Sequence, residues 1–493
     1  MPTPKFIDSK QVIADWSVKK QNFWIRQQKE NIKKLFLEII KSIPNYRNFL
    51  VRKKYKFPKK FDSSEVPQVN KKDFFKKYNL QSILPKEQLK KKGFVLTSTS
   101  GSTSEPTYFL RDDLVDYHYS IIAENFLNNG KKGSTLLINC FGMGVWIGGL
   151  ITYQAFRMAS LRGNPVTIIT PGINKKEIFN ALQKLAPMFD NVILSGYPPF
   201  IKDIVDESGL MGIDLKKIPI RLVFAAESFT EKFRDYLVEK CGIYSAYYDT
   251  MNIYGSAELG AMAFENPGTI LIRKLILNNP DLHDSFFEDK KIPTLVQYDP
   301  RFTNFEIKQK RILISGHSST NLIRYDIGDN GGVYQYEEVI SKFKELGLDL
   351  IKEANRLGIK LFELPFVYIY ERADFSTTIY GLQVYPQTIK QALENKIFFS
   401  QITGKFNLLT KYNKRHDQYL EVNIELIKGK KSNKALKTKL EQYVIKALLD
   451  ASSEFRELTK MIGVKRVKPK VILWENGHRK YFQSGVKQKW VSK

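Results

Sequence analysis

The sequence of 493 residues predicts an α/β protein with two domains. From Pro165 to Tyr254, short apolar runs alternate with stretches of helical period, which is typical of a mixed or parallel sheet covered by helices. A smaller α+β unit begins after Glu371. We therefore expect a large N-terminal domain over residues 1–371 and a small C-terminal domain over residues 372–493.

The composition limits the classes of function. The net charge is +27, from 78 basic and 51 acidic residues, but the lysine clusters are short and no nucleic-acid motif accompanies them. This favours solvated lysine-rich faces, and leaves open attraction to an acidic partner protein or to a nucleotide. The two cysteines, Cys140 and Cys241, exclude a disulfide framework and indicate a reducing compartment, so we expect a cytoplasmic protein. The first thirty residues lack the apolar core of a signal peptide.

The first third of the chain predicts helices and one ambiguous apolar segment. Residues 20–43 form an amphipathic pattern that Pro44 ends; the inward positions are Phe23, Ile25, Ile32, Leu35, Phe36 and Ile39. Basic helical pieces separated by prolines follow over 45–93, and 111–129 is helical again. Residues 136–156 carry no charge and are long enough to span a membrane, but their four glycines favour a strand, a turn and a helix from Trp146.

The middle of the chain predicts the alternating sheet. We expect strands at 166–169, 192–195 and 220–225, helices at 175–188, 201–207 and 230–240, and another strand within 246–254. Residues 270–330 are predicted to be β-rich, with turns at Asn279-Pro280 and Gly316, and 337–358 to be one long helix. The small domain should contain strands at 377–380 and 420–426 and helices at 387–394 and 434–449.

Polar motifs lie at the ends of several of these strands, where ligand sites of parallel sheets gather. The turn Thr99–Thr107 is rich in hydroxyl groups and glycine, as in phosphate-binding loops and in ordinary polar loops. The other motifs also have simpler interpretations: Glu227 as a helix cap, Tyr254-Gly255 as a core aromatic beside a turn, Gly328–Gly331 as a hairpin turn, and Arg372 with Asp374 as a surface pair.

Together and in this order, the motifs resemble the adenylate-forming superfamily (acyl-CoA synthetases, AMP-binding enzymes), with most likeness to the phenylacetate–coenzyme A ligase family. Residues 99–107 resemble its phosphate loop T-S-G-[ST]-T-G-K-P-T, except that Ser104 and Glu105 replace Gly and Lys. Its Y-G-x-[ST]-E, Y-R-x-G-D and G-R-x-D motifs appear as Tyr254–Glu258, Tyr325–Asp329 and Glu371–Asp374, and Ala225–Ser228 resembles G-A-E-P. Asn139–Gly149 resembles a glycine-rich segment of the family, which argues further against a membrane span.

The resemblance implies roles for individual residues. The phosphate loop would bind ATP through Thr99, Ser100, Gly101, Ser102 and Thr103, and the remaining nucleotide contacts would come from Ala226, Glu227, Asn252, Tyr254, Gly255, Ser256, Asp329 and Arg372. Tyr254 would stack on adenine, Asn252 would accept from its amine, Asp329 would bind the ribose hydroxyls, and Glu258 would act in catalysis by holding Mg²⁺. An acyl pocket would contain Phe141, Gly144, Trp146, Tyr197 and Ala225.

The C-terminal domain would be mobile, turning on a hinge at Asp374, and would supply a catalytic lysine. Ser484–Val491 has the Ser-to-Lys spacing of the family's tail, which selects Lys487, with Lys480 and Lys489 as rivals. Two departures stand out. Residues 330–371 are longer than the family's segment. Asp326 occupies the position of the motif's arginine, whereas Arg324 lies directly before Tyr325.

The expected function is therefore ATP-dependent activation of a carboxylic acid through an acyl-adenylate, followed by acyl transfer to a thiol, with coenzyme A as the default acceptor. Alternatives are transfer to a carrier-protein thiol or an amine, or a catalytically degenerate basic protein that binds nucleic acid or another polyanion. The acid is expected to be aromatic or otherwise apolar. A homodimer is left open.

Overall fold

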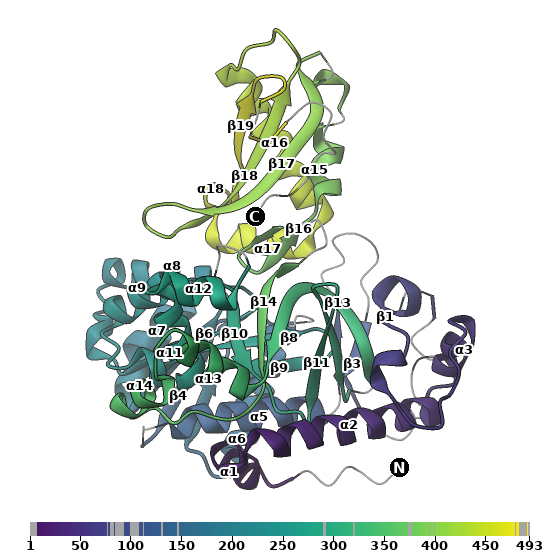
Figure 1. The fold of residues 1–493 in the computed structure, drawn as a ribbon. Coiled ribbons are helices and arrows are strands. Elements are labelled where there is room, and N and C mark those ends of the chain that lie inside the picture. The colour runs from purple at the N-terminus through teal and green to yellow at the C-terminus, as the bar shows by residue number, and fades with distance from the viewer. Residues whose placement is uncertain are drawn as a thin grey trace. The chain divides into compact units, whose positions relative to one another are not determined.

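The computed structural model describes residues 7–75, 77–78, 83, 93–98, 108–111, 113–129, 132–144, 147–288, 292–318, 321–372, 377–393, 395–398, 400–478, 480–482 and 491. These residues form two compact units (Figure 1), one ending at Glu371 and one beginning at Arg372. We call them the N-terminal and the C-terminal unit, and describe each by itself.

One large mixed sheet forms the centre of the N-terminal unit, with the strand order β11-β12-β13-β14-β10-β9-β8-β7-β6-β4-β5 and with β1 beside β13. Its parallel half consists of β5 (Val166–Ile169), β4 (Thr135–Asn139), β6 (Asn191–Gly196), β7 (Ile220–Ala225) and β8 (Thr250–Ser256). This confirms the predicted α/β fold class and the strands expected at 166–169, 192–195 and 220–225.

The other strands of this sheet are mainly antiparallel. They are β9 (Gly260–Phe264), β10 (Thr294–Gln297), β11 (Thr303–Lys308), β12 (Arg311–Gly316), β13 (Leu322–Tyr334) and β14 (Phe366–Arg372), while the short β1 (Val69–Asn70) runs parallel to β13. A separate hairpin-like pair, β2 (Val95–Ser98) and β3 (Tyr108–Arg111), flanks the predicted phosphate loop on both sides.

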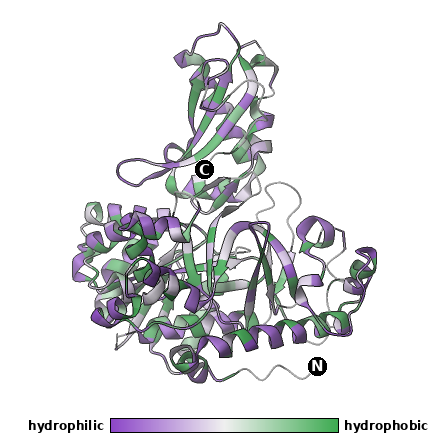
Figure 2. Cartoon of the chain, viewed as in Figure 1, coloured by the Kyte–Doolittle hydropathy of each residue, from purple (hydrophilic) through white to green (hydrophobic). Residues whose placement is uncertain are grey.

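Helices connect the parallel strands and bury their apolar faces. They are α5 (Asp113–Asn128), α6 (Ile147–Leu161), α7 (Lys175–Lys184), α8 (Pro198–Ser208) and α9 (Glu231–Cys241). The uncharged segment 136–156 is thus divided between β4 and α6, as the glycines predicted. None of the helices in the described part of the chain is long and apolar enough to cross a membrane. Figure 2 shows hydrophobic residues on central strands and a mixture of hydrophilic and hydrophobic residues on the surrounding helices.

The prediction of β structure from residue 270 was wrong for its first part. Residues 267–277 form helix α11 (Pro267–Leu277), because Asn266 and Thr269 make a capping box and Pro267 occupies the first turn. Asn279-Pro280 starts a second helix, α12 (Pro280–Phe286), where the Asn279 side chain accepts a hydrogen bond from the Leu282 N–H. The apolar, β-branched sequence of α11 is explained by burial of most of its residues.

Two other boundaries differ from the prediction. Residues 246–249 form a short helix, α10 (Ala246–Asp249), and β8 begins only at Thr250. The expected long helix at 337–358 is two helices, α13 (Tyr336–Glu345) and α14 (Leu350–Arg356). Gly347, at φ +71°, adopts the left-handed backbone between them, and Asp349 caps α14 by accepting from the Lys352 N–H.

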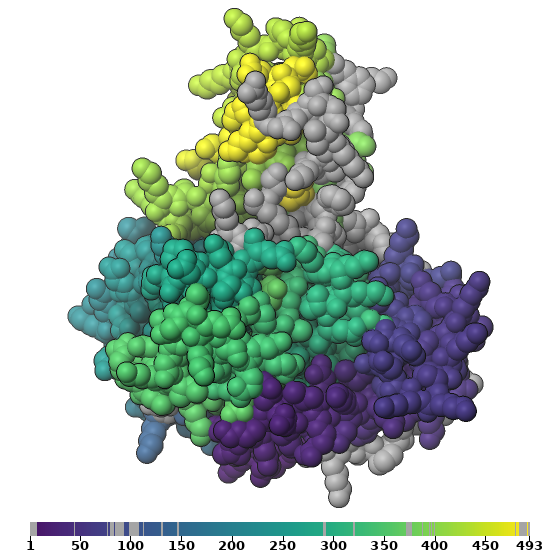
Figure 3. Space-filling model, in the orientation of Figure 1, coloured from purple at the N-terminus to yellow at the C-terminus, as the bar shows by residue number. Residues whose placement is uncertain are grey.

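The N-terminal helices pack against strands that come much later in the sequence. They are α1 (Ser9–Val18), α2 (Gln21–Ser42) and α3 (Pro44–Arg52), where Pro44 both follows α2 and begins α3. Of the predicted inward residues of α2, Leu35, Phe36 and Ile39 are fully buried, whereas Phe23, Ile25 and Ile32 are partly buried. In Figure 3 this segment, in purple, lies along one side of the N-terminal unit.

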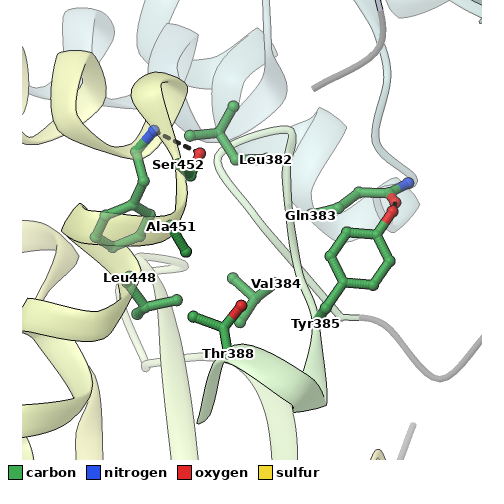
Figure 4. Close-up of a pocket in the computed structure, with 9 residues that line it drawn as sticks. Leu382, Gln383, Val384, Tyr385, Thr388, Leu448, Ala451 and Ser452 are labelled. Carbon is green, nitrogen blue, oxygen red and sulfur yellow. Dashed lines mark hydrogen bonds between the residues drawn. The ribbon is translucent and has the colours of Figure 1, made fainter. Parts of the chain in front are cut away.

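The C-terminal unit has a three-stranded sheet of β17 (Ile402–Tyr412), β18 (Gln418–Leu426) and β19 (Lys470–Trp474) and a small hairpin, β15 (Thr377–Ile379) with β16 (Leu382–Val384). Its helices are α15 (Pro386–Leu393), α16 (Lys434–Ala451), α17 (Ser453–Ile462) and α18 (Val464–Val467). A small pocket opens beside β16 and α16 (Figure 4); it is lined by Leu382, Gln383, Val384, Tyr385, Thr388, Leu448, Ala451, Ser452 and Phe455. Two of its polar side chains pair with each other, because the Tyr385 hydroxyl donates to Gln383 Oε1 at 2.5 Å.

Candidate active site

Several predicted nucleotide-binding residues lie at the carboxyl ends of neighbouring parallel strands. Ala225 ends β7, with Ala226 and Glu227 directly after it, and β8 carries Asn252 to Ser256 at its own carboxyl end. The two strands pair in register, with Ala225 opposite Ile253. Carboxyl ends of parallel strands are the usual place for ligand sites in such sheets. The pairing of β7 with β8 thus brings the Ala225–Ser228 motif next to the Tyr254–Glu258 motif.

Tyr254 and Asp329 are brought together although 75 residues separate them. The Tyr254 hydroxyl donates a hydrogen bond to Asp329 Oδ2 at 2.6 Å. Asp329 lies within the continuous strand β13, so the interpretation of residues 328–331 as a hairpin turn was wrong. Tyr254 is only partly buried, which leaves part of its ring accessible. A ring and a carboxylate held side by side can contact the base and the sugar of one nucleotide.

Glu258 and Tyr325 form a second such pair. The Tyr325 hydroxyl donates to Glu258 Oε1 at 2.9 Å, and both side chains are at least nine-tenths buried. The other carboxylate oxygen of Glu258, Oε2, accepts no hydrogen bond from the residues that the structure describes. Among them there is also no cluster of three or more His, Cys, Asp or Glu side chains that could hold a metal ion. Glu258 therefore fits Mg²⁺ only in the way that Mg²⁺ is held by one carboxylate together with the phosphates of a substrate.

Asn252 lies in β8, two residues before Tyr254. Its Nδ2 donates a long hydrogen bond of 3.5 Å to the Glu227 carbonyl, and its buried Oδ1 has no hydrogen-bond partner among the described residues. A buried acceptor without a donor costs free energy, which a ligand amine would recover. Glu227 is buried and does not cap α9, because Thr230 does so by accepting from the Phe233 N–H. The helix-cap interpretation of Glu227 was therefore wrong.

The backbone around these residues is constrained. Ala226 has φ +73°, a left-handed conformation that a residue with a Cβ rarely adopts. At Gly255 the pairing of β8 with β9 is irregular, and a Cβ there would lie 2.7 Å from the Gly260 carbonyl oxygen, so only glycine fits. The Ser256 hydroxyl accepts from the Leu259 N–H at 3.2 Å and thereby stabilises the turn that carries Glu258.

The predicted acyl-pocket residues follow β4 and β6. Phe141 is fully buried and packs edge-on against Tyr197, with ring centroids 5.1 Å apart. Asn139 fixes this loop: its Nδ2 donates to the Gly149 carbonyl at 2.9 Å and its Oδ1 accepts from the Phe141 N–H at 3.3 Å. Gly144 is exposed at φ +94°, and Ala225 is partly buried. Complete burial makes Phe141 part of the core as well as a candidate pocket wall.

Other predicted residues cannot be placed. Thr99, Ser100, Gly101, Ser102, Thr103, Trp146, Asp374, Lys487 and Lys489 lie outside the described residues. The backbone of Arg372 ends β14, but its side chain also lies outside them. Lys480 is described, and its Nζ lies over the ring of the adjacent Tyr481, 5.2 Å from the centroid. The predicted phosphate loop, hinge and catalytic lysine therefore stay predictions.

Arg324, the arginine that lies before Tyr325 instead of after it, has a structural role. Arg324 is buried at φ +48°; its Nε donates to Glu306 Oε2 at 3.0 Å, and its Nη1 donates to the carbonyls of Ser64 and Val66. Asp326, at the motif's arginine position, instead pairs with Arg311 of the adjacent strand at 2.9 Å. Sequence reasoning missed the pairing of Tyr325 with Glu258, although Tyr325 is the first residue of its own motif.

No family model and no curated protein matches the chain. Solved structures of 2-hydroxyisobutyryl-CoA ligase do match. In complex with 2-HIB-AMP and CoA in the thioesterification state, that ligase is 12% identical, with a TM-score of 0.59 over 97% of this chain and 91% of the ligase. Its postadenylation state with 2-HIB-AMP is 13% identical over the same shares, with a TM-score of 0.54.

An open conformation of the same ligase, with 2-HIB-AMP and CoA, is 13% identical and has a TM-score of 0.52 over 94% of this chain and 90% of the ligase. At these identities the likeness establishes the fold. The chain therefore has the fold of 2-hydroxyisobutyryl-CoA ligase.

Proposed function

We propose that this protein activates a carboxylic acid with ATP, forming an acyl-adenylate, and then transfers the acyl group to the thiol of coenzyme A. The observation that carries the proposal is the pairing of Tyr254 with Asp329 and of Tyr325 with Glu258. These pairs join motifs that are far apart in the sequence. The fold also supports the proposal, because the 2-hydroxyisobutyryl-CoA ligase with this fold is solved in complex with 2-HIB-AMP and CoA.

In the first step, a carboxylate oxygen of the acid attacks the α-phosphorus of ATP. The bond from that phosphorus to the bridging oxygen breaks, and pyrophosphate leaves with the bonding electrons. Negative charge develops on phosphoryl oxygens, so positioning and cationic groups carry most of the catalysis. Tyr254 would stack on the base, Asn252 Oδ1 would accept from its amine, and Asp329 would accept from the ribose hydroxyls. Glu258 would hold Mg²⁺, which neutralises phosphate charge.

In the second step, the thiolate of coenzyme A attacks the acyl carbon and AMP leaves with the shared oxygen. We propose that Lys487 is the cation that stabilises the first step and that the loop at 99–103 binds the β- and γ-phosphates. We also propose that Asp374 is the hinge on which the C-terminal domain turns between the two steps. The acid is proposed to be aromatic or otherwise apolar, in the manner of the phenylacetate–CoA ligases, because Phe141 and Tyr197 present aromatic rings to each other after β4 and β6.

The test is release of pyrophosphate from ATP and Mg²⁺ with a panel of aromatic and aliphatic carboxylic acids, with and without coenzyme A. Glu258→Gln should abolish the Mg²⁺-dependent release. Glu363→Gln is a matched control, because that carboxylate pairs with Lys20 and not with the motif residues. Wild-type release by Glu258→Gln would refute the metal assignment. Absence of both nucleotide binding and pyrophosphate release in the wild-type protein would refute the proposed function.

A further inference from the structure

A buried ionic network contacts the backbone of the candidate nucleotide site. It consists of Glu231, Arg234, Glu265 and Arg273, each at most 2% exposed. Arg234 Nη2 donates to the two Glu265 oxygens at 2.8 and 2.9 Å. Arg273 Nη1 lies 2.8 Å from both Glu231 Oε1 and Glu265 Oε1. Two carboxylates thus balance two guanidinium groups inside the N-terminal unit.

Glu265 holds Asn252 through both of its backbone groups. One carboxylate oxygen, Oε2, accepts from the Asn252 N–H at 2.9 Å, and the Glu265 N–H donates to the Asn252 carbonyl at 2.9 Å. The Asn252 side chain in turn donates to the Glu227 carbonyl. The position of Asn252, the residue with the unsatisfied buried acceptor, is therefore fixed from the Glu265 side.

Arg273 holds the neighbouring segment between β7 and α9. Its Nη2 donates to the Phe229 carbonyl at 2.6 Å, two residues after Glu227 and three after the left-handed Ala226. Because the same guanidinium group contacts Glu265, the segment after β7 and the middle of β8 are held by one connected set of charges. The network joins Phe229, within residues 226–230, to Asn252.

Stability alone does not explain this arrangement. Removing charges from water is expensive, and a buried ion pair is often no more stabilising than apolar side chains of the same volume. Burial opposes ionisation of Glu231, yet Arg234 and Arg273 bring its pKa below the ordinary value, so the network stays charged. Charged side chains, unlike apolar ones, can make directional hydrogen bonds to particular backbone atoms, here the Asn252 N–H and the Phe229 carbonyl.

We propose that Glu265 and Arg273 are positioning residues of the nucleotide site, which hold Asn252 and residues 226–230 in the geometry that selects adenine. This inference rests on the proposed function. Adenine carries an amine where guanine carries a carbonyl oxygen. An acceptor fixed at Asn252 therefore favours adenine, and a displaced acceptor loses that preference.

The experiment is calorimetric titration of the full chain with AMP and, separately, with GMP, together with thermal unfolding of each variant. Glu265→Gln keeps the size of the side chain and removes its charge. Arg273→Lys keeps the charge and loses the donor that reaches Phe229. Each should raise the Kd for AMP by up to about tenfold, the effect of losing the one neutral hydrogen bond between Asn252 Oδ1 and the adenine amine, and leave the Kd for GMP unchanged.

The control is Asp249→Asn, which weakens a pair of equal burial, Arg221 with Asp249, at the opposite ends of β7 and β8. It should lower the unfolding temperature and leave the AMP-to-GMP preference intact. The same preference in Glu265→Gln and Arg273→Lys as in the wild type would overturn the inference, as would an equal loss of preference in the control. If Glu265→Gln does not fold, Arg273→Lys decides. A wild-type protein that binds no adenine nucleotide refutes the proposed function, and this inference with it.

Discussion

The hydrogen bond between Tyr254 and Asp329 can be tested without knowing the acid. Tyr254→Phe removes the hydroxyl that lies 2.6 Å from Asp329 Oδ2 and keeps the ring that is proposed to stack on adenine. A hydrogen bond to a charged group contributes about 1.5–3 kcal/mol. Asp329 is only 8% exposed, so little water is available to replace the lost donor. We expect Tyr254→Phe to lower the free energy of unfolding by an amount within that range.

The assay is a double-mutant cycle with Tyr254→Phe, Asp329→Ala and the double variant, measured by urea unfolding. Hydrogen–deuterium exchange of peptides from β8 and β13 would assign the effect to the N-terminal unit, because protection there reports local opening. The expected coupling energy is about 1.5–3 kcal/mol, and Asp329→Ala should also weaken AMP binding. Additive effects, with a coupling below about 0.5 kcal/mol, would show that the two side chains do not interact and would refute the reasoning.

Three further predictions follow from other residues. Lys487→Ala should slow the adenylation half-reaction severely in single-turnover kinetics and spare acyl transfer from a supplied acyl-adenylate; equal loss in both halves would indicate a folding role instead. Ala226→Gly should raise the free energy of unfolding by up to about 1 kcal/mol, because glycine adopts φ +73° without strain; a destabilised variant would contradict this. Burial lowers the pKa of His118 to about 4, so the unfolded chain binds this proton more readily, and the unfolding temperature should fall as pH decreases from about 6.5 to 4; His118→Phe should flatten that profile.

The sequence identified the parallel half of the sheet because its strands are continuous apolar runs between short links. Residues 166–169 and 220–225 coincide with β5 and β7. It failed at α11, whose apolar, β-branched residues are equally compatible with a buried strand. The deciding groups were the capping pair Asn266 and Thr269 and the burial of the helix on several sides, and the second of these is set by the rest of the fold.

The sequence predicted which residues belong to the candidate site, but not which of them contact one another. Motif order suggested Tyr254 and Asp329, but their direct hydrogen bond depends on how β8 and β13 lie in one sheet. Glu265 and Arg273 carry no motif and had no signal in the sequence, because a glutamate after a strand and an arginine within an apolar helix are ordinary residues until their partners are known. The assignments at Lys487, Asp374 and the 99–103 loop stay predictions.

The attachment of the N-terminal helices has a consequence for folding during synthesis. The Trp16 side chain donates to Asp299, Arg301 binds Asp15, and the Asn31 side chain donates to the carbonyls of Pro300 and Arg301. Strand β1 pairs with residues 325 and 326. These partners are synthesised 256 to 286 residues later, which takes roughly 13–57 s at ordinary elongation rates.

During that interval the apolar face of α2, with Leu35, Phe36 and Ile39, has no native partner in β12 or β13. The parallel strands β4 to β8 are complete by Ser256 and can assemble earlier. Helices α1 and α2 leave the ribosome long before their partners, and are therefore among the last elements to reach their native positions. This order exposes hydrophobic surface on the nascent chain, so the yield of folded protein should depend on chaperones that bind the N-terminal helices.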